Sequence, residues 1–226
     1  MVKVITNSQG KVYTSSGKAL LAPSGGGGGG YQLRRITDDN NNEIGTAYME
    51  FEDANGNKYD VVCLDSIYRN SYSQWCSNTS NAVTDLPIYE SYYTSWWYTA
   101  KETATFNTQK ILDYCSANGY TSTACTHCLS KSFTIGGTTY YGQLPNAKEI
   151  FEMCNRGVEI DALDNSSGTS LERLTGYTTA LQYDNFSSTQ KSAVQYWKFG
   201  HDGGINGYSK SGSSGIRTCP VLEIPK

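Results

Sequence analysis

The chain has 226 residues, of which 17% are charged, and its formal net charge is −3 at pH 7. This charge provides no basic field to gather phosphates, so we expect no nucleic-acid partner. The length suits one medium domain with an appendage. Polarity comes from Ser, Thr, Asn and Gly, with 18 Tyr and 4 Trp among them. This composition is typical of recognition surfaces, where rings give rigid contact area and small polar residues give adaptable hydrogen bonds.

Residues 1–22 are expected to form an attachment segment. Extended pieces at 3–6 and 11–14 flank a turn, and residues 17–21 follow. They offer too little apolar area for an independent fold, so the segment must pack on something else. Residues 23–30 contain six consecutive glycines, whose backbone freedom predicts a flexible hinge. A glycine-rich structural turn is the alternative.

The start of the chain has no apolar stretch of signal-peptide length, and no window approaches the ~20 apolar residues of a membrane span. We therefore expect a protein that is made in a cytosol and is not inserted into a membrane. An odd number of cysteines leaves at least one thiol without a partner in the chain. We expect most of them to be reduced and buried: Cys63, Cys76, Cys115, Cys125, Cys128, Cys154 and Cys219.

Residues 31–65 are predicted to form β-strands. The runs 46–51 and 58–64 surround Asn55-Gly56, a pair that favours a hairpin because both residues tolerate positive φ. The run 38–42 is predicted to be a polar loop. Residues 66–106 are rich in Tyr and Trp and are expected to form a long excursion with one or two strands near its end. We favour burial for Trp96 and Trp97, and leave the tyrosines of this stretch open between core and interface.

Two helices and further strands are predicted next. Asn107 can cap a helix through Asn118, with Gly119 ending it. Asn146 and Glu149 form a capping-box pattern ahead of a second helix, which Gly157 is placed to end. After residue 180, strands are expected around 193–199 and 216–224, separated by a Gly/Ser/Asn-rich loop at 200–215. The fold class is therefore α+β, with loops outweighing regular structure.

Several short motifs follow one another along 107–224. Asn107-Thr108 and Asp113-Tyr114-Cys115 are followed by Gly142-Gln143-Leu144-Pro145-Asn146-Ala147-Lys148-Glu149-Ile150, Phe186-Ser187-Ser188-Thr189, Tyr196-Trp197 and Ile216-Arg217-Thr218-Cys219-Pro220-Val221. In this order they resemble the C-type-lectin-like domains of bacterial and phage surface and fibre proteins, the type first named for the C-terminal domain of a bacterial collagen-like adhesin. Gly142 stands near a position where that family usually has Trp, and Thr218-Cys219 is inserted before the final Pro-Val.

The resemblance implies a C-type-lectin-like domain at 31–226, with two helices, short antiparallel strands, long loops and an N-terminal β-hairpin. It also implies display on a phage fibre or decoration. Ligand contacts are expected where the family presents its variable surface. The candidate ligand-binding residues are Tyr183, Asn185, Tyr196, Lys198, His201, Asn206, Tyr208 and Lys210. The alternative for the loop 200–215 is a solvated connection.

Metal and catalytic chemistry is not expected. Cys125-Thr126-His127-Cys128 supplies one Cys-x-x-Cys pair, but zinc sites usually need a second pair. A local disulfide or buried thiols are therefore favoured. The start of an EF-hand pattern at Asp38 lacks the required Gly and closing Glu. With only two histidines and no Gly-x-Ser-x-Gly elbow, the chain is expected to be neither an enzyme nor a cofactor protein.

These expectations describe a phage virion structural protein, a head- or tail-fibre component assembled in the host cytoplasm. It would contact other virion proteins through residues 1–22, form a homo-oligomer, and bind a bacterial surface glycan or protein. Two alternatives are a purely structural decoration or adaptor protein without a host ligand, and a bacterial surface adhesin.

Overall fold

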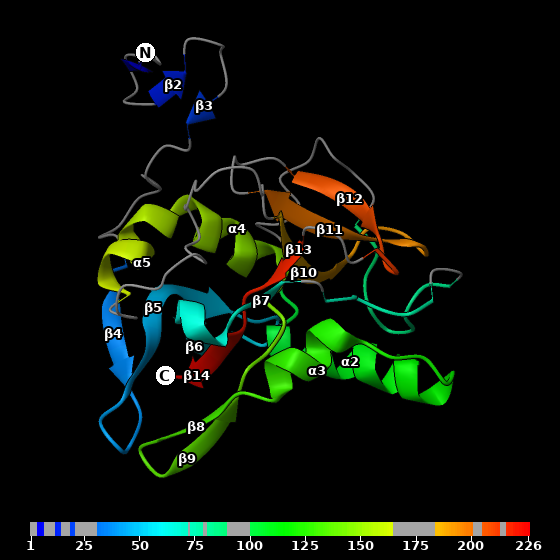
Figure 1. Ribbon diagram of the computed structural model, residues 1–226, viewed down its shortest axis with the longest axis horizontal. Coiled ribbons are helices and arrows are strands. Elements are labelled where there is room, and N and C mark those ends of the chain that lie inside the picture. The colour runs from blue at the N-terminus through cyan, green and yellow to red at the C-terminus, as the bar shows by residue number, and fades with distance from the viewer. Residues whose placement is uncertain are drawn as a thin grey trace.

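The computed structural model describes ten stretches of the chain. They are residues 4–6, 12–14, 19–20, 31–71, 73–78, 81–89, 100–164, 184–200, 205–212 and 216–226. Helices and antiparallel strands are mixed along this part of the chain, which confirms the α+β class (Figure 1). The predicted hinge glycines, Trp96 and Trp97 lie outside the described residues.

The N-terminal segment contains three short strands. They are β1 (Val4–Thr6), β2 (Val12–Thr14) and β3 (Ala19–Leu20), which pair antiparallel as a sheet of their own. The expected extended pieces are confirmed as strands. The attachment role of the segment stays a prediction.

The first large sheet has the strand order β14-β6-β5-β4. Its strands are β4 (Arg34–Thr37), β5 (Glu43–Glu52), β6 (Lys58–Leu64) and β14 (Val221–Pro225). The predicted hairpin between β5 and β6 is confirmed, and Gly56 has φ of +82° in its turn. Alternate residues of β6 belong to two apolar clusters on the two faces of the sheet. Burial on both faces explains why β6 ends in the continuous apolar run Val61–Leu64.

The second sheet has the strand order β12-β11-β10-β13-β7. Its strands are β7 (Asn70–Ser71), β10 (Asp184–Gln190), β11 (Gln195–Gly200), β12 (Ile205–Ser209) and β13 (Ile216–Thr218). The prediction that 200–215 is only a loop was wrong, because Ile205–Ser209 pairs along β11 in a regular antiparallel register. The predicted strand 216–224 is divided into β13 and β14 around Cys219-Pro220. No strand lies near the end of the 66–106 excursion in its described residues; the 3-10 helix η1 (Ser66–Tyr68) and β7 lie near its start.

Helix α4 (Ala147–Asn155) packs against strands of both sheets. Its predicted capping box is confirmed: Asn146 Oδ1 accepts from the Glu149 N–H at 2.9 Å, and Glu149 Oε2 accepts from the Asn146 N–H at 2.8 Å. Helix α4 ends at Asn155, with Arg156 as its C-cap, so the predicted helix stops just before Gly157. Gly157 is not followed by a loop. It opens α5 (Gly157–Leu163) instead.

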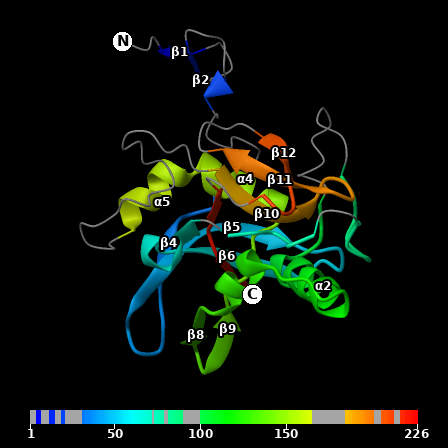
Figure 2. The same ribbon diagram turned by 45° about the vertical axis from the view of Figure 1, so that its right-hand side comes forward.

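Helix α2 (Ala104–Ala117) has its N-cap at Thr103, four residues before the predicted cap. Thr103 caps it by accepting a hydrogen bond from the Phe106 N–H, and Asn107 lies inside the helix. The sequence analysis missed α3 (Thr123–Leu129) and the hairpin of β8 (Ser132–Ile135) with β9 (Thr138–Tyr141). Figures 1 and 2 show this hairpin projecting from the body on the side away from α4.

The motifs that carry the family resemblance lie against one another. The Pro145 carbonyl accepts from the Ser188 N–H at 2.7 Å, and Thr189 Oγ1 accepts from the Ala147 N–H at 2.9 Å. Gln143 and Val221 exchange two backbone hydrogen bonds. Segments far apart in the sequence therefore form one hydrogen-bonded unit between α4 and the two sheets. Among the described helices, none is long and apolar enough to cross a membrane.

Candidate functional site

The second sheet brings several predicted site residues onto two neighbouring strands. Tyr196 of β11 pairs with Tyr208 of β12, and Lys198 pairs with Asn206. Alternate residues of a strand point to the same face, so Tyr196 and Lys198 share a face with Tyr208. We call the surface formed by the side chains of Lys198 and Tyr208 the β11–β12 face. The intervening residues Trp197 and Phe199 lie in the core cluster that includes α4.

A stack of rings supports this face. Tyr196 is stacked on Phe186, with ring centroids 5.0 Å apart, and on Trp75, with centroids 6.0 Å apart and planes 3° apart. The Tyr208 ring meets the Tyr196 ring edge-on at 6.2 Å. The indole N–H of Trp75 donates to the Ser187 carbonyl at 2.9 Å, which anchors the stack to β10. The rings below Tyr208 are thus buried and fixed before any ligand binds.

Lys198 and Tyr208, the two side chains of the face, are half-buried. Lys198 Nζ lies 4.8 Å from the centroid of the Tyr208 ring, a cation–π geometry that pairs a positive charge with an aromatic surface. Gly212 lies against the same ring, because a Cβ at this position would overlap Tyr208 Cε1. The two partly exposed side chains therefore place an ammonium group beside an aromatic ring, a combination suited to polar ligands with apolar faces.

Two of the predicted ligand contacts lie in the core. Tyr196 is 0% exposed and Lys210 is 1% exposed. Neither side chain can therefore contact a ligand directly in this structure. Lys210 Nζ donates to Gln190 Oε1 at 2.6 Å and to the Asn81 carbonyl at 3.2 Å, and it lies 4.9 Å from the centroid of the Trp75 ring. Burial lowers the pKa of Lys210 to about 8. Both residues support the β11–β12 face from beneath.

The remaining predicted site residues are only partly located. Asn185 is opposite Phe199 in the β10–β11 register, and Asn206 is opposite Lys198 in the β11–β12 register. Asn206 therefore adjoins the β11–β12 face along the backbone, whereas Asn185 pairs with a residue of the other face. Tyr183 and His201 lie outside the described residues.

A hollow that the sequence analysis did not identify lies beside the start of α2. It has a volume of about 310 Å³. Its lining includes Asp53, Tyr59, Lys101, Glu102 and Phe106. The carboxylate of Asp53 is used within the β5–β6 turn, where it accepts hydrogen bonds from the backbone N–H groups of Asn55 and Asn57. Phe106, which lies in the first turn of α2, is an exposed apolar side chain beside this hollow, and this exposure is seen only in the structure.

The Cys-x-x-Cys pair lies on helix α3 as two buried thiols, so of the two expected states the local disulfide is not present. Cys125 and Cys128 are buried on α3, and burial raises the pKa of the Cys125 thiol to about 12. His127 Nε2 lies 2.8 Å from the Tyr68 carbonyl. Within the described residues, which include all seven cysteines, every cysteine is a thiol and no three His, Cys, Asp or Glu side chains gather as a metal site.

The turns that resemble calcium loops use their carboxylates internally. Asp38 accepts from the backbone N–H groups of Asn40 and Asn42 and from the Asn42 side chain. These hydrogen bonds lower the pKa of Asp38. The carboxylate closes its own turn, as side chains of Asp commonly do in loops.

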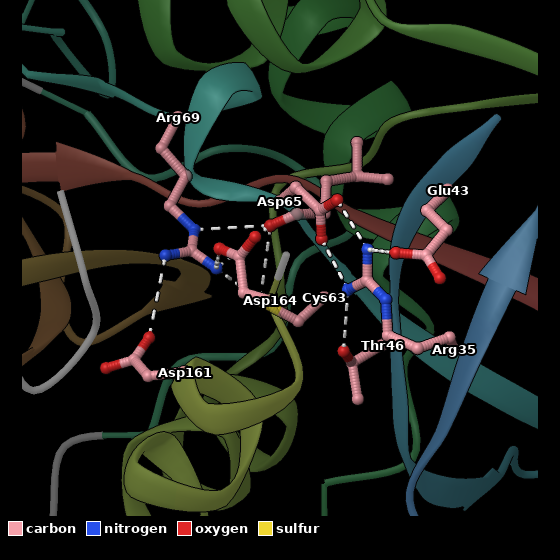
Figure 3. A network of polar contacts seen from close by, with 9 residues as sticks. Arg35, Glu43, Thr46, Cys63, Asp65, Arg69, Asp161 and Asp164 are labelled. Atoms are coloured by element: carbon pink, nitrogen blue, oxygen red, sulfur yellow. Dashed lines mark hydrogen bonds and ion pairs between the residues drawn. The ribbon is translucent and has the colours of Figure 1, made fainter. Parts of the chain in front are cut away.

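A buried ionic network surrounds Arg69 (Figure 3). Its guanidinium donates to the Leu64 carbonyl from Nε at 3.2 Å and from Nη2 at 3.0 Å. It forms ion pairs with Asp161 at 4.0 Å and Asp164 at 3.9 Å. Burial opposes its charge, but the nearby thiols and carboxylates outweigh burial and raise the pKa of Arg69.

Arg35 extends the same polar region toward β4 (Figure 3). It binds Asp65 through two hydrogen bonds of 2.7 Å and also donates to Thr46 Oγ1 at 3.0 Å. Since these carboxylates are enclosed and bound to cations, we assign the network to holding α5 and β4 against β6.

The chain matches no protein-family model, no curated protein and no solved structure.

Proposed function

We propose that this chain is a phage virion structural protein, a head- or tail-fibre component, which displays a lectin-like domain that binds glycans of the bacterial cell surface. The observation that carries the proposal is the β11–β12 face. Lys198 and Tyr208 are partly exposed side by side, and a buried stack of rings fixes the position of Tyr208. Sugar rings have apolar faces that pack on aromatic side chains and hydroxyl or acidic groups that an ammonium can bind.

The arrangement of the family motifs supports the lectin-like part of the proposal. The Pro145 and Ser188 segments hydrogen-bond to each other, and the last strand, β14, pairs with β6 near the start of the domain. The two longer helices, the short antiparallel strands and the C-terminal strand agree with the arrangement that the resemblance implies. In this proposal the chain binds without catalysing a reaction, and residues 1–22 dock on other virion proteins.

Binding to bacterial surfaces tests the proposal. The full chain, biotinylated and assembled on streptavidin to provide several copies, is applied to a glycan array and to intact bacteria. We expect binding to a defined group of surface glycans, and loss of that binding in Lys198→Ala and Tyr208→Ala. Tyr141→Ala is the matched control, because Tyr141 is an exposed aromatic residue on the distant strand β9.

Two other outcomes would decide against the proposal. A chain that binds no glycan and no cell in multivalent form would favour a purely structural decoration or adaptor role. Binding that survives both β11–β12 substitutions but disappears in Phe106→Ala would transfer the site to the hollow beside α2.

A further inference from the structure

Cys76 and Cys115 form a pair of buried thiols with their sulfur atoms 3.5 Å apart. Cys76 follows Trp75 in the stretch 73–78, and Cys115 lies on the buried side of α2. Both belong to the core cluster that contains Tyr196 and Phe186. A disulfide bond is about 2.05 Å long, so a shift of roughly 1.5 Å between the sulfurs would form one.

The backbone around Cys76 holds this stretch beside α2 and β12. The Cys76 N–H donates to the Lys210 carbonyl at 2.9 Å, and the Ser77 N–H donates to the Thr121 carbonyl at 2.8 Å. The Gln74 side chain donates to the Ser211 carbonyl at 2.8 Å. These bonds fix Cys76 on the side facing Cys115 without help from a covalent bond. The pair is thus preorganised in the reduced chain.

The two thiols are electrostatically unequal. Cys115 donates its S–H to Cys76 Sγ. This hydrogen bond is the largest cause that lowers the pKa of Cys76 below its ordinary value, while burial opposes the shift and Asn78 and Lys210 assist it. Burial instead raises the pKa of Cys63 to about 12 and that of Cys125 to about 12. Among these buried cysteines, Cys76 is the one whose surroundings stabilise a thiolate, the form that reacts in thiol–disulfide exchange.

We propose that Cys76 and Cys115 are a redox-active pair that forms an intrachain disulfide under oxidising conditions. The oxidant class is a small-molecule disulfide such as oxidised glutathione. The Cys76 thiolate attacks one glutathione sulfur, the glutathione S–S bond breaks, and the released thiolate takes the proton that Cys76 had lost. Cys115 then gives up its proton and attacks the Cys76 sulfur, and the second glutathione leaves as a thiol carrying that proton. Two electrons pass from the protein to the oxidant.

The bond would act as a clamp beneath the β11–β12 face. It would join α2 to the stretch that holds Trp75 and that hydrogen-bonds to Lys210, two residues after Tyr208. Because both sulfurs are buried, exchange requires this stretch to open, so oxidation and reduction are slow in the folded chain. The disulfide itself follows from the thiol geometry and does not depend on the proposed glycan binding.

Redox titration of the full chain tests the inference. The chain is equilibrated in glutathione buffers of different ratios, both in the folded state and during refolding, and is then mapped by peptide mass spectrometry. We expect a single cross-link between the peptides of Cys76 and Cys115, and a mass lower by two hydrogens. The cross-link closes a loop with a sequence separation of 39 residues, and should raise Tm by roughly 10 °C.

Three variants make the result specific. Cys76→Ser and Cys115→Ser should each abolish the cross-link and the Tm shift, whereas Cys125→Ser, from the same core cluster, should keep both. A different preferred pair, such as Cys125 with Cys128, would overturn the inference. So would a chain that retains all seven thiols after refolding under oxidising conditions.

Discussion

Glu149 lies in the capping box of α4 and is also part of a buried carboxyl pair. Its Oε2 accepts from the Asn146 N–H, but its Oε1 is buried without a donor in the described structure. Burial is the main cause that raises the pKa of Glu149 well above its ordinary value, and the charge of Glu223 adds to it. Glu223 is itself engaged, because its carboxylate accepts from the N–H groups of Ala104 and Thr105 at the start of α2. A proton on Glu149 therefore lets the two side chains coexist.

This pair predicts a pH-dependent difference between the wild type and Glu149→Gln. The folded state holds the Glu149 proton above the pH at which the unfolded chain releases it. The stability contributed by this group is therefore complete below the unfolded pKa and is lost as pH rises through the folded pKa. The amide of Gln mimics the protonated acid at every pH. We expect the free energy of unfolding of the variant, relative to wild type, to increase as pH rises from about 4 to about 8.

Urea denaturation at a series of pH values measures this difference. Glu159→Gln is a suitable comparison, because Glu159 lies on the neighbouring helix α5 and its side chain is exposed. A difference between Glu149→Gln and wild type that does not change with pH would show that Glu149 is ionised in the folded chain.

Single residues also show where sequence reasoning stops. The Asn146 and Glu149 roles were predictable, since a capping box is read from residues three apart. The burial of Tyr196 and Lys210 was not, because both residue types occur at surfaces and their covering ring, Trp75, lies more than 100 positions away. The cation Arg69 is similarly buried by carboxylates of α5, which are distant in sequence.

The two helix caps differ in burial, so they predict different costs of removal. Thr103 caps α2 at a partly exposed position, and Thr103→Ala should cost about 1 kcal/mol of the free energy of unfolding. Asn146 is fully buried and also donates to the Glu102 carbonyl at 3.0 Å. Asn146→Ala removes the hydrogen-bond partner of the Glu149 N–H and that of the Glu102 carbonyl, and should cost about 2–3 kcal/mol of the free energy of unfolding. Equal losses in urea denaturation would contradict this account of the caps.

Strand β12 predicts a contrast between two glycines near Tyr208. A Cβ at Gly212 would overlap the Tyr208 ring, whereas a Cβ at Gly207 would meet the Lys191 side chain, whose end can move aside. We expect Gly212→Ala to displace the Tyr208 ring and weaken glycan binding by about 10-fold, as loss of an aromatic contact does. Gly207→Ala should bind as wild type does. Binding to the glycan array measures both, and equal binding by the two variants would argue against a role for the Tyr208 position.

Elements were predictable where a local pattern specifies them. The Asn55-Gly56 hairpin and α4 carry such patterns, and both are present. The β8–β9 hairpin also carries a local sequence pattern, the pair Gly136-Gly137, and both glycines have positive φ in its turn. The sequence analysis did not use this pair. Helix α3 has seven residues and no long apolar stripe. Strand β12 is rich in Gly, Asn and Ser and is specified by pairing with β11, not by its own propensity.

The whole molecule depends on contacts between distant parts of the chain. Strand β14 pairs with β6, and β13 lies between β10 and β7. The succession of strands and helices along the chain predicted the α+β class but not this order of strands, because strands far apart in the sequence, such as β6 and β14, carry no local signal of their pairing. The same contacts place the β11–β12 face on a sheet that is supported by α4 from its other side.

The dissociation constant of the full chain for the glycan that it binds on the array tests the central claim most directly. It is measured for wild type, Tyr208→Ala and Tyr141→Ala, with Tm recorded for each. We predict that Tyr208→Ala raises the dissociation constant about 10-fold or more. Tyr141→Ala should leave it within about twofold of wild type. An unchanged dissociation constant in Tyr208→Ala, or equal losses in both variants at unchanged Tm, would contradict the assignment of the β11–β12 face as the binding site.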